Sequence, residues 1–149
     1  MAIDIDLVLV AVDSSEQSRE AAEYAVALAG RYGADVHLLH FVDHRMMHGI
    51  ETGDIPPDEL AEKQQAVTDA VRDCLPGDGS VEFTFSGAVG FSGSKLGQTP
   101  GGVILDVADE LDADFLVVPR EVPTGEPDEV VGKAALHVLE YASQPTLSV

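Results

Sequence analysis

The sequence predicts an α/β fold: a single open parallel sheet of five strands with four helices on its two faces. Strand patterns and helix patterns alternate along all 149 residues. Most strands appear as short, continuous apolar runs, which are typical of strands buried on both faces of a parallel sheet. Because crossovers between parallel strands are right-handed, one sheet with helices on both faces is the simplest topology.

The first unit is a strand, a turn and a helix. Leu7–Val12 is an apolar run of strand length in which every second residue is a β-branched valine, and Asp13 follows it. Ser14 and Gln17 have the spacing of a capping box, and Gly33 supplies a stop. The helix between them has apolar residues at helical intervals: Ala21, Ala25, Leu28 and Tyr32.

The second unit begins with the apolar strand Val36–Val42. We expect His44–Pro57 to be irregular, because this segment contains two glycines and two prolines. A second helix follows and ends before Pro76. One face of that helix carries Leu60, Gln64, Val67 and Val71.

The third strand alternates apolar and polar residues over Val81–Phe85, which predicts an edge strand with one wetter face. Six glycines between Gly87 and Gly102 predict a long loop, more simply a flexible insertion than a phosphate cradle. A third helix has Pro100 near its start, where a missing N–H costs little. Its apolar residues are Val103, Ile104, Val107, Ala108 and Leu111.

Phe115–Val118 is the fourth strand, and Pro119 ends it. A loop over Arg120–Asp128 leads to the last helix, and Pro145 separates that helix from a short terminal strand, Thr146–Val149. The apolar residues of the last helix are Val131, Ala135, Val138, Leu139 and Ala142.

Length and composition predict a single domain over residues 1–149, because 45% of the residues are hydrophobic. The longest apolar run is far shorter than the ~20 residues that cross a bilayer, and the N-terminal residues lack the basic region of a signal peptide. We therefore expect a cytoplasmic protein with no membrane partner. The single cysteine, Cys74, has no second thiol to pair with and is interpreted as a small apolar helix residue.

Net charge is the most unusual bulk property, with 27 acidic and 8 basic residues giving −19 at pH 7. This charge disfavours nucleic acid as a partner, because DNA binding relies on Lys and Arg at the phosphates. Self-repulsion is screened far better in molar salt than in dilute buffer, so the charge and the three lysines point to a salty cytoplasm. An ordinary acidic protein is the alternative.

Four segments, read together, resemble the universal stress protein family: residues 10–16 (VAVDSSE), 34–42 (ADVHLLHFV), 104–118 (ILDVADELDADFLVV) and 138–147 (VLEYASQPTL). The resemblance implies an adenine nucleotide alpha hydrolase-like fold with strand order 3-2-1-4-5. It also implies a homodimer formed by antiparallel pairing of the terminal strands. We expect a non-catalytic stress-response module with a protein partner that the sequence does not identify.

ATP-binding members of that family carry Gly, two residues, Gly, nine residues and then Gly-Ser or Gly-Thr after the fourth strand. In this sequence the corresponding positions are Pro119, Val122, Gly132 and Lys133, so one of four matches. Pro119 has no N–H, and Val122 brings a branched side chain where bare backbone is needed. We expect weak ATP binding or none; a nucleotide-dependent switch and a cleft for another small molecule are the alternatives.

The candidate ligand-binding residues are Asp13, Val42, Gly132 and Lys133. Asp13 ends the first strand, where open α/β sheets bind ligands, and resembles the family's acidic residue near the nucleotide. The resemblance assigns Val42 to the same cleft. Gly132 and Lys133 lie in the first turn of the last helix, where backbone amides hold anions. Asp13 as a simple turn residue and Lys133 as an exposed helix lysine are the alternatives.

We assign no catalytic or metal-binding residue. The nearest stretch to a nucleotidyl transferase motif lacks its glycine, and no nucleophile elbow is present. Two of the clustered histidines, His37 and His40, point to opposite faces of a strand, which disfavours a metal site. The other two histidines are His44 and His48.

Overall fold

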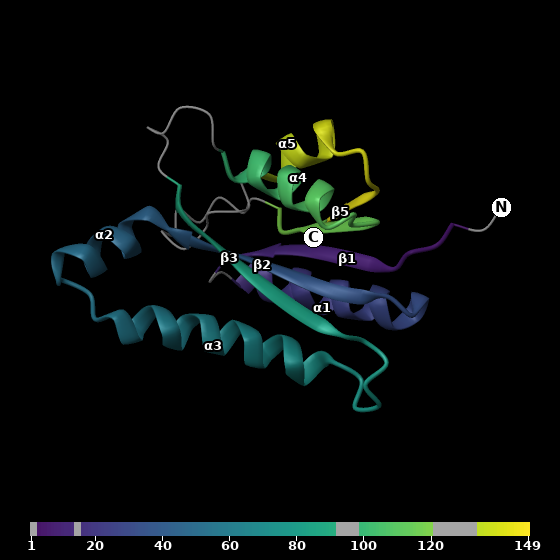
Figure 1. The fold of residues 1–149 in the computed structure, drawn as a ribbon, viewed down its shortest axis with the longest axis horizontal. Coiled ribbons are helices and arrows are strands. Elements are labelled where there is room, and N and C mark those ends of the chain that lie inside the picture. Colours follow the sequence, from purple (N-terminus) through teal and green to yellow (C-terminus); the bar gives the residue numbers. More distant parts are fainter. Residues whose placement is uncertain (1–2, 14–15, 92–98, 121–133) are drawn as a thin grey trace.

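The computed structural model of the protein describes residues 3–13, 16–91, 99–120 and 134–149. These residues form one five-stranded parallel sheet of order β3-β2-β1-β4-β5, which confirms the expected fold and strand order (Figure 1). The strands are β1 (Leu7–Val12), β2 (Asp35–Asp43), β3 (Phe83–Phe91), β4 (Phe115–Val118) and β5 (Thr146–Ser148).

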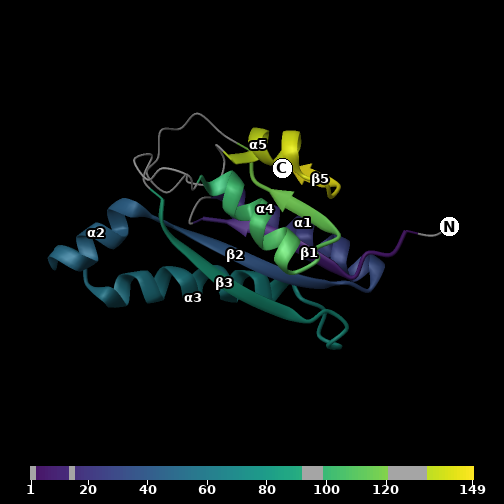
Figure 2. The same ribbon diagram turned by 45° about the horizontal axis from the view of Figure 1, so that its top comes forward.

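Helices cover both faces of the sheet. Helices α1 and α3 lie against one face, and α4 and α5 lie against the other (Figures 1 and 2). The described residues form five helices, so the expected count of four is wrong. The helices are α1 (Glu16–Tyr32), α2 (His44–Thr52), α3 (Pro57–Cys74), α4 (Pro100–Glu110) and α5 (Ala135–Tyr141).

Strand β1 joins the two halves of the core, because its side chains alternate between the faces of the sheet. Val8, Val10 and Val12 pack in the cluster that α1 and α3 complete. Leu9 and Ala11 pack in the cluster of α4 and α5. The exposed fraction of each of these side chains is at most 1%, as expected for a strand buried on both faces.

Helix α2 is the additional helix, and it occupies most of the segment that we expected to be irregular. Gly49 lies inside it, with its carbonyl accepting a 2.9 Å hydrogen bond from the Ile55 N–H. The Ile55 side chain folds over Gly49, and a Cβ on Gly49 would collide with Ile55 Cδ1. The absence of a side chain at Gly49 therefore lets Ile55 pack closely against α2, and the glycine does not break the helix.

The glycine-rich segment also differs from the expected loop at both of its ends. Strand β3 continues through Gly87 to Phe91, because β2 keeps supplying ladder partners such as His40 for Gly87. Helix α4 begins at Pro100, where the Thr99 hydroxyl accepts a 3.1 Å hydrogen bond from the Gly102 N–H. Residues 92–98 lie outside the described part. The edge position of β3 is confirmed.

Smaller differences concern helix ends and side chains. Cys74, interpreted as a small apolar helix residue, lies at the end of α3 and is exposed. Helix α5 ends at Tyr141, leaving Ala142 as its C-cap, and Leu139 is 48% exposed. The expected cap Ser14 and the helix residue Val131 lie outside the described residues. Within the described ranges, no helix is long and apolar enough to span a bilayer.

Candidate functional site

The strand order changes direction between β1 and β4, and the crevice at the carboxyl ends of these strands is where open α/β sheets bind ligands. Asp13 follows β1 directly. Val42 lies near the end of β2, two residues beyond His40, the register partner of Val12. Asp13 and Val42 are 2% and 4% exposed, so two predicted site residues are buried at the same edge of the sheet.

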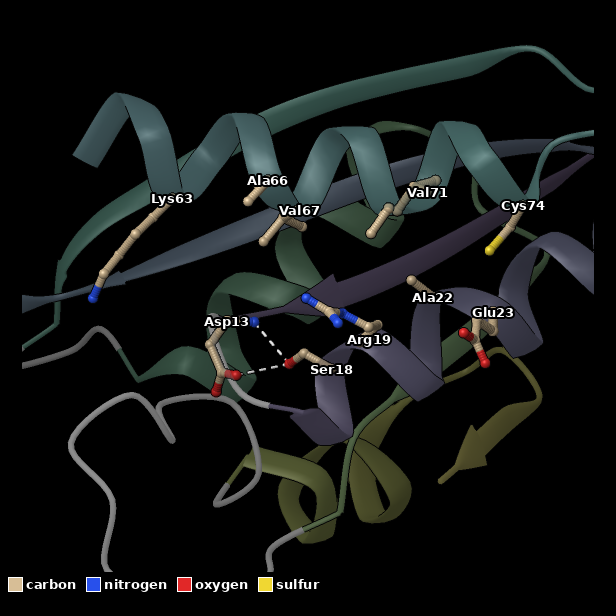
Figure 3. A pocket seen from close by; sticks show the side chains of 11 residues that line it. Asp13, Ser18, Arg19, Ala22, Glu23, Lys63, Ala66, Val67, Val71 and Cys74 are labelled. Carbon is tan, nitrogen blue, oxygen red and sulfur yellow. Dashed lines mark hydrogen bonds between the residues drawn. The ribbon is translucent and has the colours of Figure 1, made fainter. Parts of the chain in front are cut away.

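Asp13 is held in place by Ser18, a residue that the sequence analysis missed. The Asp13 N–H donates to Ser18 Oγ at 2.8 Å, and the Ser18 hydroxyl donates to Asp13 Oδ1 at 2.8 Å (Figure 3). Ser18 is 1% exposed in the first turn of α1. The sequence signal that could have identified Ser18 is a hydroxyl residue five positions after the aspartate that ends the strand.

His40 is buried next to this pair, on the sheet face that α1 and α3 cover. In the described part of the chain, neither ring nitrogen of His40 has a hydrogen-bond partner, and the residue is 4% exposed. Burial lowers the pKa of His40, and the negative charge of Asp13 opposes that shift. The site therefore places a neutral imidazole close to a fixed carboxylate.

The two described residues that follow β4, Pro119 and Arg120, offer no free backbone N–H to an anion. Pro119 has no N–H, and the Arg120 N–H donates to the Val149 carbonyl oxygen at 2.8 Å. The Val149 N–H in turn donates to the Val118 carbonyl at 3.0 Å, so the terminal strand occupies this edge. Val122, Gly132 and Lys133 lie outside the described residues, and the structure does not place them.

The histidines of β2 separate as expected, on opposite faces of the strand. His37 Nδ1 lies 2.7 Å from Thr84 Oγ1, and His37 Nε2 lies 2.9 Å from Ser86 Oγ, so both ring nitrogens contact hydroxyls of β3. Among the residues that the structure describes, no group of three or more His, Cys, Asp or Glu side chains converges as metal ligands would.

A groove of about 190 Å³ opens between α1 and α3, with Asp13 at one end (Figure 3). The sequence analysis did not predict it, because a groove depends on how two helix faces meet. The signal was a set of small residues at helical spacing on both helices. The residues that line the groove are Asp13, Ser18, Arg19, Ala22, Glu23, Lys63, Ala66, Val67, Ala70, Val71 and Cys74.

Comparison with known proteins gives a family match over almost the whole chain. The model of the universal stress protein family matches residues 5–149. Among curated proteins, none matches the sequence significantly.

Solved structures of low sequence identity share the fold. A universal stress protein in complex with cAMP superposes with a TM-score of 0.68 at 17% identity, covering 99% of this chain and 98% of that one. UspA from Lactobacillus plantarum has a TM-score of 0.65 at 20% identity, covering 99% of each chain. A universal stress protein from Archaeoglobus fulgidus in complex with dAMP has a TM-score of 0.57 at 18% identity, covering 99% and 98%. The chain shares with these structures the fold described as adenine nucleotide alpha hydrolase-like.

Proposed function

The chain belongs to the universal stress protein family, and from this premise we propose that it is a non-catalytic regulatory module of the stress response that binds ATP weakly or not at all. It works in the cytoplasm as a homodimer and passes its signal to a protein partner. Two parts of the cleft bear on this proposal. The phosphate end is the segment that follows β4, beginning with Pro119 and Arg120, and the base end is the part beside Asp13 and Val42.

The observation that most supports the proposal is the lack of free backbone N–H groups at Pro119 and Arg120, directly after β4. ATP-binding relatives have bare glycine backbone there, and the first of those glycines corresponds to Pro119. A phosphate needs several N–H groups directed at it. Pro119 has none, and the Arg120 N–H is already bonded to the Val149 carbonyl at 2.8 Å. Two successive positions therefore provide no free backbone donor for a triphosphate.

Charge weakens phosphate binding further. The sequence that follows Arg120 carries four acidic residues, at positions 121, 126, 128 and 129. Gly132 and Lys133 are the remaining candidates for an anion contact. A single ammonium is a point charge that molar salt screens, and it does not replace a ring of amides.

A nucleotide-dependent switch is the second candidate, and the base end of the cleft favours it. Asp13 is buried at the switch point with its carboxylate fixed by Ser18, and Val42 lies at the same edge. Relatives of the same fold have been solved with cAMP and with dAMP. Both candidate functions use this end of the cleft. They differ in how much binding affinity the contacts to the phosphates would add.

The homodimer is proposed from the terminal strand. Strand β5 pairs with β4 on one side and is the edge of the sheet on the other. An open edge favours pairing with a second copy. Exposed apolar residues on the neighbouring helix α5, Leu136 at 77% and Tyr141 at 63%, add surface that association would cover.

The small molecules retained by the purified protein test the proposal. Protein purified in high salt is denatured, and the released compounds are identified and quantified by mass spectrometry. We expect far less than one ATP per chain. ATP released in stoichiometric amount would contradict the proposal and support the switch.

A further inference from the structure

The outer edge of β3 is open to a further strand. Strand β3 lies at one end of the strand order, so among the described elements only β2 pairs with it (Figures 1 and 2). The Val36 N–H donates to the Glu82 carbonyl, and in a parallel ladder alternate residues of a strand bond to the same neighbour. The N–H and C=O groups of Phe83, Phe85 and Gly87 are therefore directed to the outer edge.

Strand β3 lacks the features that usually protect an edge. Natural edge strands are blunted by charged side chains or by proline. Strand β3 spans nine residues without an aspartate, glutamate, lysine, arginine or proline, although 23% of the chain is charged. Phe85 is 59% exposed and stacks on Phe83, with ring centroids 6.4 Å apart. The edge thus presents backbone donors and acceptors beside an apolar surface.

A pocket of about 40 Å³ lies between β3 and α3, next to this edge. It has no lining residue in common with the groove between α1 and α3. Its volume exceeds the about 10–15 Å³ that one water needs and is far below the about 150 Å³ of a cavity that accepts benzene, so only a group about as small as a carboxamide fits. Among the residues that line it are His40 of β2, Phe85, Ser86 and Gly87 of β3, and Gln64 and Thr68 of α3.

The pocket contains an imidazole without a hydrogen bond. His40 is 4% exposed, and within the described ranges neither of its ring nitrogens has a partner. The hydroxyls that line the pocket are engaged elsewhere. The Thr68 hydroxyl donates to the Gln64 carbonyl at 2.9 Å. Ser86 Oγ lies 2.9 Å from His37 Nε2, on the opposite face of the sheet. Because buried polar groups are nearly always paired, His40 is available to a group that enters the pocket.

Gly87 gives a side chain from the outer edge access to His40. The two residues are register partners, and a Cβ on Gly87 would have no atom closer than 4.0 Å. A strand added beyond β3 lies two strand spacings, about 9–10 Å, from β2. A glutamine side chain is long enough to cross above Gly87. Its carboxamide both donates and accepts, so it suits either tautomer of His40 without bringing a charge.

We propose that the outer edge of β3 binds an extended segment of a partner protein as an additional antiparallel strand, with a glutamine side chain in the pocket beside His40. The segment is uncharged where it pairs and basic at its ends, which complements the net charge of −19 and Glu82, exposed directly before β3. A second copy of this chain fits poorly, because β3 contains no glutamine and pairing centred on Gly87 leaves the pocket empty. The inference rests on the proposed action through a protein partner and does not depend on the affinity for ATP.

Calorimetric titration of the full chain with the peptide acetyl-KTVTQTVTK-amide tests the strand addition. We expect saturable binding of one peptide per chain, and replacing the central glutamine by leucine or by glutamate should weaken binding at least about tenfold. N-methylation of the two valines, whose N–H groups face β3 in this pairing, should abolish binding. The matched control is N-methylation of the two threonines beside the glutamine, whose N–H groups face away. Absent saturation, or equal effects of the two methylations, would overturn the proposal.

Substitutions in the chain locate the peptide. Gly87→Thr closes the mouth of the pocket, and since its Cβ has space the protein stays folded while peptide binding is lost. The matched control is Gly77→Thr, in an exposed turn with nothing within 4 Å of the added Cβ, which should change nothing. His40→Leu should reverse the preference, so that the leucine peptide binds more tightly than the glutamine peptide. Wild-type affinity in Gly87→Thr, or an unchanged preference in His40→Leu, would refute the site.

Light scattering separates a partner segment from a second copy. The peptide should leave the assembly of the chain intact. Dissociation of the assembly by the peptide would show that a second copy occupies the β3 edge and would overturn the proposal. Stoichiometric ATP released from protein that binds the peptide would contradict the proposed weak ATP binding and leave the β3 site standing, so the two proposals fail separately.

Discussion

The Ser18 hydroxyl donates to Asp13 Oδ1 at 2.8 Å and accepts from the Asp13 N–H at 2.8 Å, so one side chain contacts both the carboxylate and the backbone of the same residue. This contact fixes the end of β1 to the first turn of α1. Both residues are almost fully buried, which makes the contact costly to lose. It determines the direction of the Asp13 carboxylate at the switch point.

Ser18→Ala should lower the free energy of unfolding by about 1–3 kcal/mol, because it removes two buried hydrogen bonds and the variant side chain replaces neither. Chemical denaturation measures the change. The control is Ser143→Ala, at an exposed position, which should stay within about 0.5 kcal/mol of the wild type. Equal stabilities of the two variants would mean that the Asp13–Ser18 contact contributes little.

The free energy of unfolding should decrease as the pH is lowered, in part because of His40. Burial lowers the pKa of His40 below its ordinary value of 6.5, so below about pH 6.5 the unfolded chain takes up a proton that the folded chain does not. Protonation of His40 therefore costs the fold no stability above that pH and progressively more below it. We expect His40→Leu to reduce the loss between about pH 7 and pH 5, measured by urea denaturation. The acidic residues titrate in both proteins, so parallel curves would contradict the assignment to His40.

Salt should stabilise the protein. The charge of −19 per chain becomes −38 in a dimer, and the screening length falls from ~30 Å at 0.01 M to ~3 Å at 1 M. The midpoint of thermal unfolding should rise steadily with KCl up to molar concentration. Flat or falling midpoints over this range would remove the case for a high-salt cytoplasm.

The outer edge of β5 should form the dimer. The Leu116 N–H donates to the Pro145 carbonyl, and the Val149 N–H donates to the Val118 carbonyl, so alternation directs the Ser148 N–H to the open edge. Ser148→Pro removes that donor and leaves the bonds to β4, since edge strands tolerate proline. We expect folded monomers by light scattering, and dimers for Ser148→Ala. A dimeric Ser148→Pro variant would place the interface elsewhere.

Patterns that are local in the sequence predicted the sheet well. The apolar runs Leu7–Val12 and Phe115–Val118 match β1 and β4 at both ends, because burial on both faces leaves a continuous apolar signal. The alternation around Phe83 gave the correct edge position for β3. The end of α1 was also predicted correctly from one residue. Gly33, expected to stop the helix, follows α1 with a φ of 67°.

Two glycines lie inside a helix and a strand, and tertiary contacts explain both. Gly49 belongs to a helix because Ile55 packs where a Cβ would be, and the sequence gives no sign of that contact. Gly87 belongs to a strand because β2 supplies a ladder partner. In both cases a favourable contact outweighs the local cost of glycine, which is about 1 kcal/mol.

The candidate site was predicted in part. Asp13 could be placed because it follows an apolar run at the carboxyl end of a parallel strand, where open α/β sheets bind ligands, whereas Val42 was assigned through the family resemblance. Ser18 and the groove were not predicted. Both depend on which side of a helix is turned toward its neighbour, and the sequence pattern does not determine that orientation. Gly132 and Lys133 lie outside the described residues, so their roles remain predictions.

Calorimetric titration with AMP, ADP and ATP, each with Mg²⁺ in molar KCl, tests the central claim most directly. Two backbone contacts forgone, at about 1.5–3 kcal/mol each, correspond to roughly two to four orders of magnitude in affinity. We therefore expect a dissociation constant for ATP above ~100 μM, no gain in affinity with each added phosphate, and no change on Lys133→Ala. Micromolar ATP affinity that rises from AMP to ATP would contradict the account, and its loss in Lys133→Ala would identify the lysine as the phosphate ligand.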